Sequence, residues 1–171
     1  MNILAGRFKG KKIRTIAKAS YRPTKSRVRK SIFDILGDLD GCSVLDLFAG
    51  SGILGFEAAS RGAVAVTFVD NDRRNVQLIH MNSQILQDQV DLKVIRKESI
   101  HYLRVRHEYD IIFADPPYGK IDLFKLVEKC LTTLLNNGRF VLETSSRESI
   151  PVGGSSKKFG DSMITIWTKT V

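Results

Sequence analysis

The chain has 171 residues, 43% of them hydrophobic and 26% charged, a balance that fits one globular domain and excludes a disordered or fibrous chain. No apolar run reaches the roughly 20 residues of a membrane-spanning helix, and the first 30 residues are too charged for a signal peptide. The two cysteines, Cys42 and Cys130, form neither a disulfide nor a metal-binding pattern. We therefore expect a cytoplasmic protein without a membrane anchor or a metal.

Basic residues are concentrated at the N-terminus. The formal net charge is +9, and residues 1–30 hold eleven of the 27 basic residues and no acidic one. This asymmetry favours a polyanionic partner, so we expect the segment to bind nucleic acid; a solvated arm that only aids solubility is the alternative. The expected RNA contacts are Arg7, Lys9, Lys11, Lys12, Arg14, Arg22, Lys25, Arg27 and Arg29.

The predicted elements alternate between helices and apolar strands. A two-strand hairpin around residues 6–10 precedes a helix that begins at Thr24 and buries Val28, Ile32, Ile35 and Leu36. Strands are expected at 43–48, 65–69, 92–95, 111–114, 140–143 and, antiparallel, 163–168, and helices at 53–60, 73–86 and 123–135. This order predicts a mostly parallel sheet covered on both faces, which binds ligands at the carboxyl ends of its strands.

A glycine-rich loop follows the predicted strand 43–48. Gly50, Gly52 and Gly55 have the spacing of a dinucleotide fingerprint, and Asp70 follows the next strand, where its carboxylate can accept both ribose hydroxyls of an adenosine. The loop alone does not separate a nicotinamide or flavin site from an S-adenosylmethionine site. Asp46 favours S-adenosylmethionine, because a carboxylate at this strand end suits a cationic ligand better than a pyrophosphate.

A second loop, Asp115-Pro116-Pro117-Tyr118, directly follows the predicted strand 111–114. Two prolines hold its backbone extended, so the Asp115 carboxylate and the Pro116 carbonyl can accept both hydrogens of an exocyclic amine. Tyr118 offers a face on which a nucleobase can stack. Such hydrogen bonds direct the nitrogen lone pair at an electrophilic methyl group, and positioning supplies most of the rate.

Together these loops resemble the class I S-adenosylmethionine-dependent methyltransferases of exocyclic amines. Three further segments, AGRFKGKKI (5–13), RPTKSRVRKSIFDIL (22–36) and LDLFAGSGILGFEAASRGA (45–63), resemble the RsmD family, which methylates guanine N2 of 16S ribosomal RNA. The resemblance implies a three-layer Rossmann-like α/β fold with a seven-stranded sheet whose last strand is antiparallel. It implies a basic N-terminal extension, residues 1–23, before a methyltransferase domain, residues 24–171.

The resemblance also implies the site residues. The target amine would be held by the catalytic residues Asp115, Pro116, Pro117 and Tyr118. S-adenosylmethionine would be bound by Asp46, Phe48, Ala49, Gly50, Ser51, Gly52, Asp70 and Asn71. The family's acid after the third strand has no clear counterpart here, and either Glu98 or Ser99 can serve. Asn82 matches a family position for which we expect a structural role.

The expected substrate is 16S rRNA within the small ribosomal subunit or an assembly intermediate, and the expected state is a monomer. Three alternatives stay open: a DNA adenine-N6 methyltransferase, a nicotinamide-dependent oxidoreductase and a non-catalytic rRNA-binding assembly factor. A DNA methyltransferase is disfavoured because 171 residues leave no room for a separate recognition domain.

Overall fold

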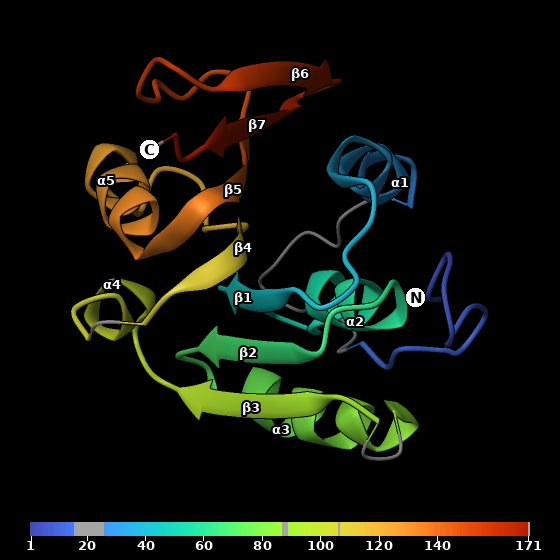
Figure 1. Ribbon diagram of the computed structural model, residues 1–171. Helices are drawn as coiled ribbons and strands as arrows, with labels where there is room; N and C mark the ends of the chain where they lie inside the picture. The colour runs from blue at the N-terminus through green and yellow to red at the C-terminus, as the bar shows by residue number, and fades with distance from the viewer. Residues whose placement is uncertain (16–25, 87–88, 106, 171) are drawn as a thin grey trace.

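The computed structural model describes residues 1–15, 26–86, 89–105 and 107–170. Its centre is a seven-stranded sheet of order β3-β2-β1-β4-β5-β7-β6 (Figure 1). The strands are β1 (Ser43–Leu47), β2 (Ala65–Asp70), β3 (Asp91–Arg96), β4 (Tyr109–Ala114), β5 (Leu134–Ser145), β6 (Ser155–Phe159) and β7 (Ser162–Thr168). The first five are parallel to one another, and β7 is antiparallel to both of its neighbours. The predicted α/β fold with an antiparallel last strand is confirmed.

Helices cover both faces of this sheet (Figure 1). The helices α1 (Ser26–Leu36), α2 (Ile53–Ser60) and α3 (Arg73–Ser83) pack on one face, and α4 (Ser99–Tyr102) and α5 (Leu123–Thr133) on the other. Alternate residues of each central strand enter the two cores: Val44 contacts the first and Leu45 the second. Strands buried on both faces have near-continuous apolar sequences, which explains why the central strands were predictable. Within the described residues, no helix is long and apolar enough to cross a bilayer.

Several predicted elements differ in detail. On α1, the predicted residues Val28, Ile32 and Leu36 are buried, but Ile35 is 51% exposed. Phe33, which was not predicted to be buried, takes its place in the core. The chain leaves α5 after Thr133 and enters β5 at once, whereas a helix to Leu135 and a strand from Phe140 were expected. Strand pairing overrides the turn sequence here, because the Asn137 N–H donates to the Lys169 carbonyl (2.9 Å).

Three shorter features also depart from the prediction. The helix expected to extend to Leu86 ends at Ser83 and continues as a 3₁₀ turn, Gln84–Leu86. The predicted hairpin is reduced to one antiparallel bridge between Asn2 and Lys12. Strand β6 was not expected, because its polar, exposed residues lack the alternating apolar pattern of a half-buried strand.

Residues 1–15 are packed onto α2. Ile3, Phe8 and Ile13 are buried in the same core as the helix. The fully buried Glu57 carboxylate accepts the N–H groups of Leu4 (2.8 Å) and Ala5 (3.1 Å). The basic N-terminal residues are thus presented from a folded segment.

Candidate active site

A cavity of about 450 Å³ lies at the carboxyl ends of β1, β2 and β4. Ten of the fourteen predicted catalytic and cofactor-binding residues line it: Phe48, Gly50, Asp70, Asn71, Glu98, Ser99, Asp115, Pro116, Pro117 and Tyr118. Four further lining residues were not predicted: Asp72, Asn75, Lys120 and Ile121. The two loops that the sequence singles out therefore meet at one cavity.

The glycine-rich loop turns sharply between β1 and α2. Gly50 and Gly52 have φ angles of 56° and 78°, and Phe48 has 55°, a left-handed conformation that is uncommon for a bulky residue and is often found at binding sites. The Gly52 N–H donates to the Ala49 carbonyl (2.7 Å), which closes the turn. Gly55 has a different role: a Cβ there would lie 2.3 Å from the Phe68 ring, so this glycine permits close packing of α2 on β2.

Asp70 is fixed at the end of β2 by three donors. Its carboxylate accepts the N–H groups of Gly50 and Asp72, both at 2.8 Å, and the amide of Asn75 at 3.2 Å. Burial raises the pKa of this carboxyl, and the three hydrogen bonds oppose that rise. Asp70 therefore presents preorganised acceptor oxygens to the cavity, the chemistry that ribose hydroxyls require.

Asp46, which was predicted to contact the cofactor, is absent from the cavity lining. It is 2% exposed, and its carboxylate accepts the N–H of Gly55 (3.0 Å). The residue before α2 is Gly52, which has no side chain to cap the helix. Asp46, on β1, therefore accepts one of the N–H groups that are free at the start of α2. Burial raises the pKa of Asp46 to about 8. Ala49, Ser51 and Gly52 are likewise absent from the cavity lining.

The Asp115-Pro116-Pro117-Tyr118 loop directly follows β4 and lines the cavity. Pro116 is buried, Asp115 is partly exposed and Tyr118 is 38% exposed. The Tyr118 hydroxyl and the Ser162 hydroxyl, at the start of β7, form a hydrogen bond of 3.3 Å. The loop thus combines a carboxylate, a backbone carbonyl and an accessible aromatic ring, as an amine-bearing base requires.

Glu98 and Ser99 both line the cavity after β3. The Glu98 carboxylate caps α4 by accepting the N–H groups of Ile100 (3.0 Å) and His101 (2.7 Å). Ser99 is 3% exposed. Both residues that the sequence left open are therefore near the cavity, and Glu98 also has a structural role.

The predicted RNA contacts divide into three groups. Arg7, Lys9, Lys11, Lys12, Arg14 and Arg27 are exposed; Arg22 and Lys25 lie outside the described residues. Arg29 was wrongly predicted to contact RNA: it is fully buried, lies 3.5 Å from a Glu57 carboxylate oxygen and donates to the Asn2 carbonyl (2.6 Å).

Asn82 has the structural role that was expected. Its buried side-chain amide donates to the carbonyls of Arg14 and Ser51, both at 3.1 Å, and accepts the Arg14 N–H (2.9 Å). It therefore joins the basic segment to the glycine-rich loop.

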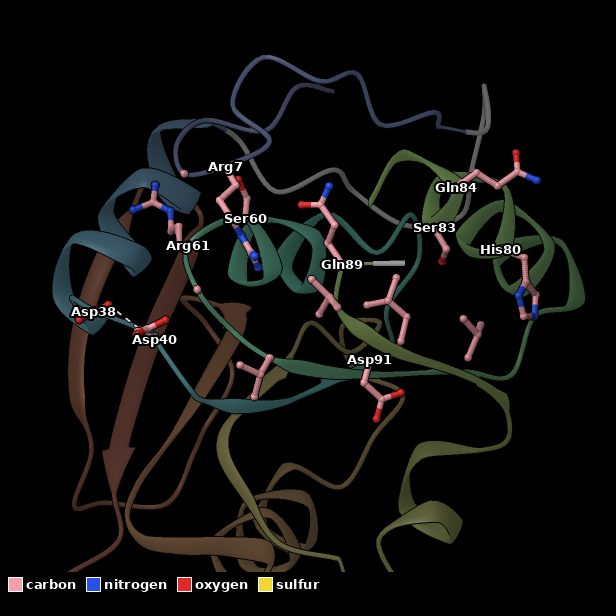
Figure 2. A pocket seen from close by; sticks show the side chains of 16 residues that line it. Arg7, Asp38, Asp40, Ser60, Arg61, His80, Ser83, Gln84, Gln89 and Asp91 are labelled. Atoms are coloured by element: carbon pink, nitrogen blue, oxygen red, sulfur yellow. Dashed lines mark hydrogen bonds between the residues drawn. The ribbon is translucent and has the colours of Figure 1, made fainter. Parts of the chain in front are cut away.

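A second, larger cleft of about 1330 Å³ lies at the opposite edge of the sheet, near the starts of β2 and β3 (Figure 2). Of the predicted site residues that the structure describes, Arg7 is the one that lines it. No cluster of metal-binding side chains is found in the described ranges. The predicted catalytic residues all line the smaller cavity.

The strand order, the glycine-rich loop and the cavity fit a methyltransferase. The solved structure of yhhF from Escherichia coli, which is named as a methyltransferase, has a TM-score of 0.87 at 26% identity and covers 100% of this chain and 98% of that protein. The Thermus thermophilus protein TTHA0928 has a TM-score of 0.85 at 27% identity, covering 100% of this chain and 99% of that protein. TrmN from Thermus thermophilus has a TM-score of 0.67 at 25% identity, covering 84% of this chain and 48% of TrmN.

The chain belongs to the family described as Conserved hypothetical protein 95, whose model matches residues 1–168; this is the RsmD family, so the resemblance is confirmed. Ribosomal RNA small subunit methyltransferase D of Haemophilus influenzae is 33% identical over 142 residues, 80% of this chain and 72% of the relative. Its Escherichia coli K12 counterpart is 31% identical over 140 residues, 81% of this chain and 68% of the relative. Membership of a methyltransferase family excludes the oxidoreductase alternative.

Proposed function

We propose that this protein transfers a methyl group from S-adenosylmethionine to the exocyclic N2 amine of a guanine in small-subunit ribosomal RNA. One observation carries the proposal: Asp70, which suits a ribose, and the Asp115–Tyr118 loop, which suits an aminated base, line the same cavity. The names of the relatives support ribosomal RNA as the substrate.

The residues present fit this cofactor. Asp70 offers oriented acceptors to ribose hydroxyls, and Gly50 contributes bare backbone to the same cavity. When bound, S-adenosylmethionine supplies an electrophilic methyl group. Asp115 and the Pro116 carbonyl accept the two amine hydrogens, so that the nitrogen lone pair is directed toward the methyl group. As the N–C bond forms, the bond from that carbon to sulfur breaks and S-adenosylhomocysteine is released. The nitrogen then loses one proton to the Asp115 carboxylate or to water.

The tyrosine and the basic residues hold the RNA. Tyr118 stacks on a guanine that has left its own stack, as enzymes acting on nucleobases require. Among the described residues, Lys120 is the one cation that lines the cavity, beside four carboxylates, and it is placed to meet a phosphate at the mouth. The exposed basic side chains of residues 1–15 provide further phosphate contacts away from the site.

The proposal includes the setting of the reaction. Residues 1–23 serve as the RNA-binding extension and residues 24–171 as the methyl-transfer domain. A monomer acts in the cytoplasm on 16S rRNA of the small subunit or of an assembly intermediate. The concentration of basic residues before α1 supports this division.

The direct test is transfer of a labelled methyl group to small ribosomal subunits that lack their guanine methylation, with nucleoside mass spectrometry of the product. We expect N2-methylguanosine at one site. Asp115→Ala should lower turnover by about 10²-fold or more, because it removes an oriented acceptor, and should leave S-adenosylhomocysteine affinity within about twofold. Asp161→Ala, in the exposed turn between β6 and β7, is the matched control and should keep full activity.

Two results would replace the proposal. Label on adenine of duplex DNA, with none on subunits, would establish the DNA adenine-N6 alternative, whose amine the same acceptors fit. Binding of S-adenosylhomocysteine and of subunits without any transfer would indicate a non-catalytic assembly factor.

A further inference from the structure

The loop that follows Tyr118 is tied to the end of the neighbouring strand β5 by a carboxylate that does not line the cavity. The Gly119 N–H donates to Glu148 Oε1 at 2.7 Å, across 29 residues of sequence. The neighbouring Tyr118 hydroxyl is bonded to Ser162, at the start of β7. Two adjacent residues of the candidate base-binding loop are thus held by separate contacts.

Glu148 is itself held by a rigid part of the fold. Its second oxygen, Oε2, accepts the N–H of Ser145 (2.9 Å), the last residue of β5. The Glu148 N–H donates back to the Ser145 carbonyl (3.1 Å), and the Ser146 N–H donates to the Asp161 carbonyl (2.8 Å). The carboxylate is therefore anchored to the β5–β7 pair while it binds the loop.

Little else in the described structure fixes Gly119. Its φ of +67° lies in the left-handed region, and no heavy atom comes within 4 Å of the position a Cβ would take. Within the loop, the Lys120 N–H donates to the Pro117 carbonyl at 3.3 Å, which closes a turn but does not attach it to the sheet. The charge-assisted hydrogen bond that Gly119 donates to the Glu148 carboxylate is stronger than a neutral one and can select one loop conformation.

We propose that Glu148 is a positioning residue for methyl transfer, which fixes the Tyr118–Gly119 segment so that the acceptors and the stacking ring face the target base together. This inference rests on the proposed function. Because Glu148 is absent from the cavity lining, it acts through Gly119 and makes no contact with cofactor or base. A misplacement of about 1 Å in such a site can lower the rate about 100-fold.

The test compares Glu148→Ala and Glu148→Gln with the wild type. Alanine removes both acceptors; glutamine keeps one acceptor oxygen and sets its NH₂ against the second N–H. We expect kcat on small subunits to fall about 10- to 100-fold for alanine and less for glutamine, with S-adenosylhomocysteine affinity within about twofold of wild type. Glu128→Ala is the matched control, since the side chain of this exposed residue on α5 makes no hydrogen bond or ion pair with the described residues.

A second readout does not depend on activity. Amide hydrogen exchange, followed by NMR, should show the Gly119 and Ser145 N–H groups exchanging faster in Glu148→Ala, more slowly in Glu148→Gln and slowest in the wild type. Unchanged exchange of Gly119, or wild-type kcat in the alanine variant, would overturn the inference. Equal losses of kcat and of cofactor affinity would also overturn it, because they indicate general damage. An inactive wild type with faster Gly119 exchange in the variant would instead count against the proposed function and leave the loop contact established.

Discussion

Replacing Glu57 with alanine should strongly destabilise the protein, because this carboxylate is the buried junction between the N-terminal segment, α1 and α2. The Glu57 side chain is fully buried; it accepts two N–H groups from residues 4–5, pairs with Arg61 at 2.9 Å and lies 3.5 Å from the Arg29 guanidinium. Without it, Arg29 would remain a buried charge with no opposite charge beside it. Burial already lowers the pKa of Arg29, and Glu57 opposes that shift.

The expected cost follows from these contacts. Removing one partner of a buried ion pair costs about 3–5 kcal/mol, and each N–H left without an acceptor costs at least about 1 kcal/mol. Because these contributions overlap, we expect Glu57→Ala to lower the free energy of unfolding by about 4–6 kcal/mol, a large share of the roughly 5–15 kcal/mol typical of a domain. Glu57→Gln, which keeps an acceptor, should cost less.

Urea unfolding followed by circular dichroism measures this loss. Combining Glu57→Gln with Arg29→Met should cost less than the sum of the single changes, because the double variant no longer buries the Arg29 guanidinium without its carboxylate. Asp34→Ala is the control: its pair with Lys30 is 2.7 Å long but exposed and should contribute at most about 1 kcal/mol. A loss below about 1.5 kcal/mol for Glu57→Ala, or strict additivity of the pair, would refute the reasoning.

Three further changes test other features. Burial raises the pKa of Asp46 to about 8, so the native state holds a proton that the unfolded chain has lost; stability should fall as pH rises from about 4 to about 8, by up to about 1.4 kcal/mol per pH unit. Asp46→Asn should remove this slope in urea titrations at several pH values, and parallel curves for both proteins would contradict it. Changing Lys11, Lys12 and Arg14 together to alanine should flatten the salt dependence of RNA affinity by about 2 units of log K per log salt; an unchanged slope would exclude these side chains from phosphate binding. Gly6→Ala places a Cβ 1.8 Å from a carbonyl oxygen of α2 and should lower the free energy of unfolding by about 2–4 kcal/mol. Gly10→Ala, at a similar φ but in open space, should lower it by only about 1 kcal/mol. Equal losses in thermal or urea unfolding would contradict the packing argument.

The elements that carry the site could be predicted because their physical requirements are local. The strands before Gly50 and Asp115 are near-continuous apolar runs. The glycines and prolines of the two loops restrict the backbone over a few residues. Parallel strands then bring their carboxyl ends to one edge, so that Asp70 and Asp115 line one cavity.

The misjudged residues depend on partners distant in the sequence. In the sequence Arg29 lies among basic residues that are exposed, whereas Arg29 itself is buried beside Glu57, a residue of another helix. Glu148 belongs to an unpatterned polar stretch, and its role appears only when β5 and the loop after β4 are placed side by side. Strand β6 depends on pairing with β7, since its own sequence is that of a solvated segment.

The attachment of residues 1–15 also has a consequence for folding order. The hydrogen bonds that join this segment to α2 and α3 link residues 52 to 68 positions apart. During synthesis these basic residues emerge before their anchors, because Glu57 and Ser60 lie on α2 and Asn82 lies on α3. Closing such long loops has an entropic cost that must be met before the contacts form. The proposed RNA-binding segment is therefore translated before its anchors and should be among the last parts of the described structure to become ordered.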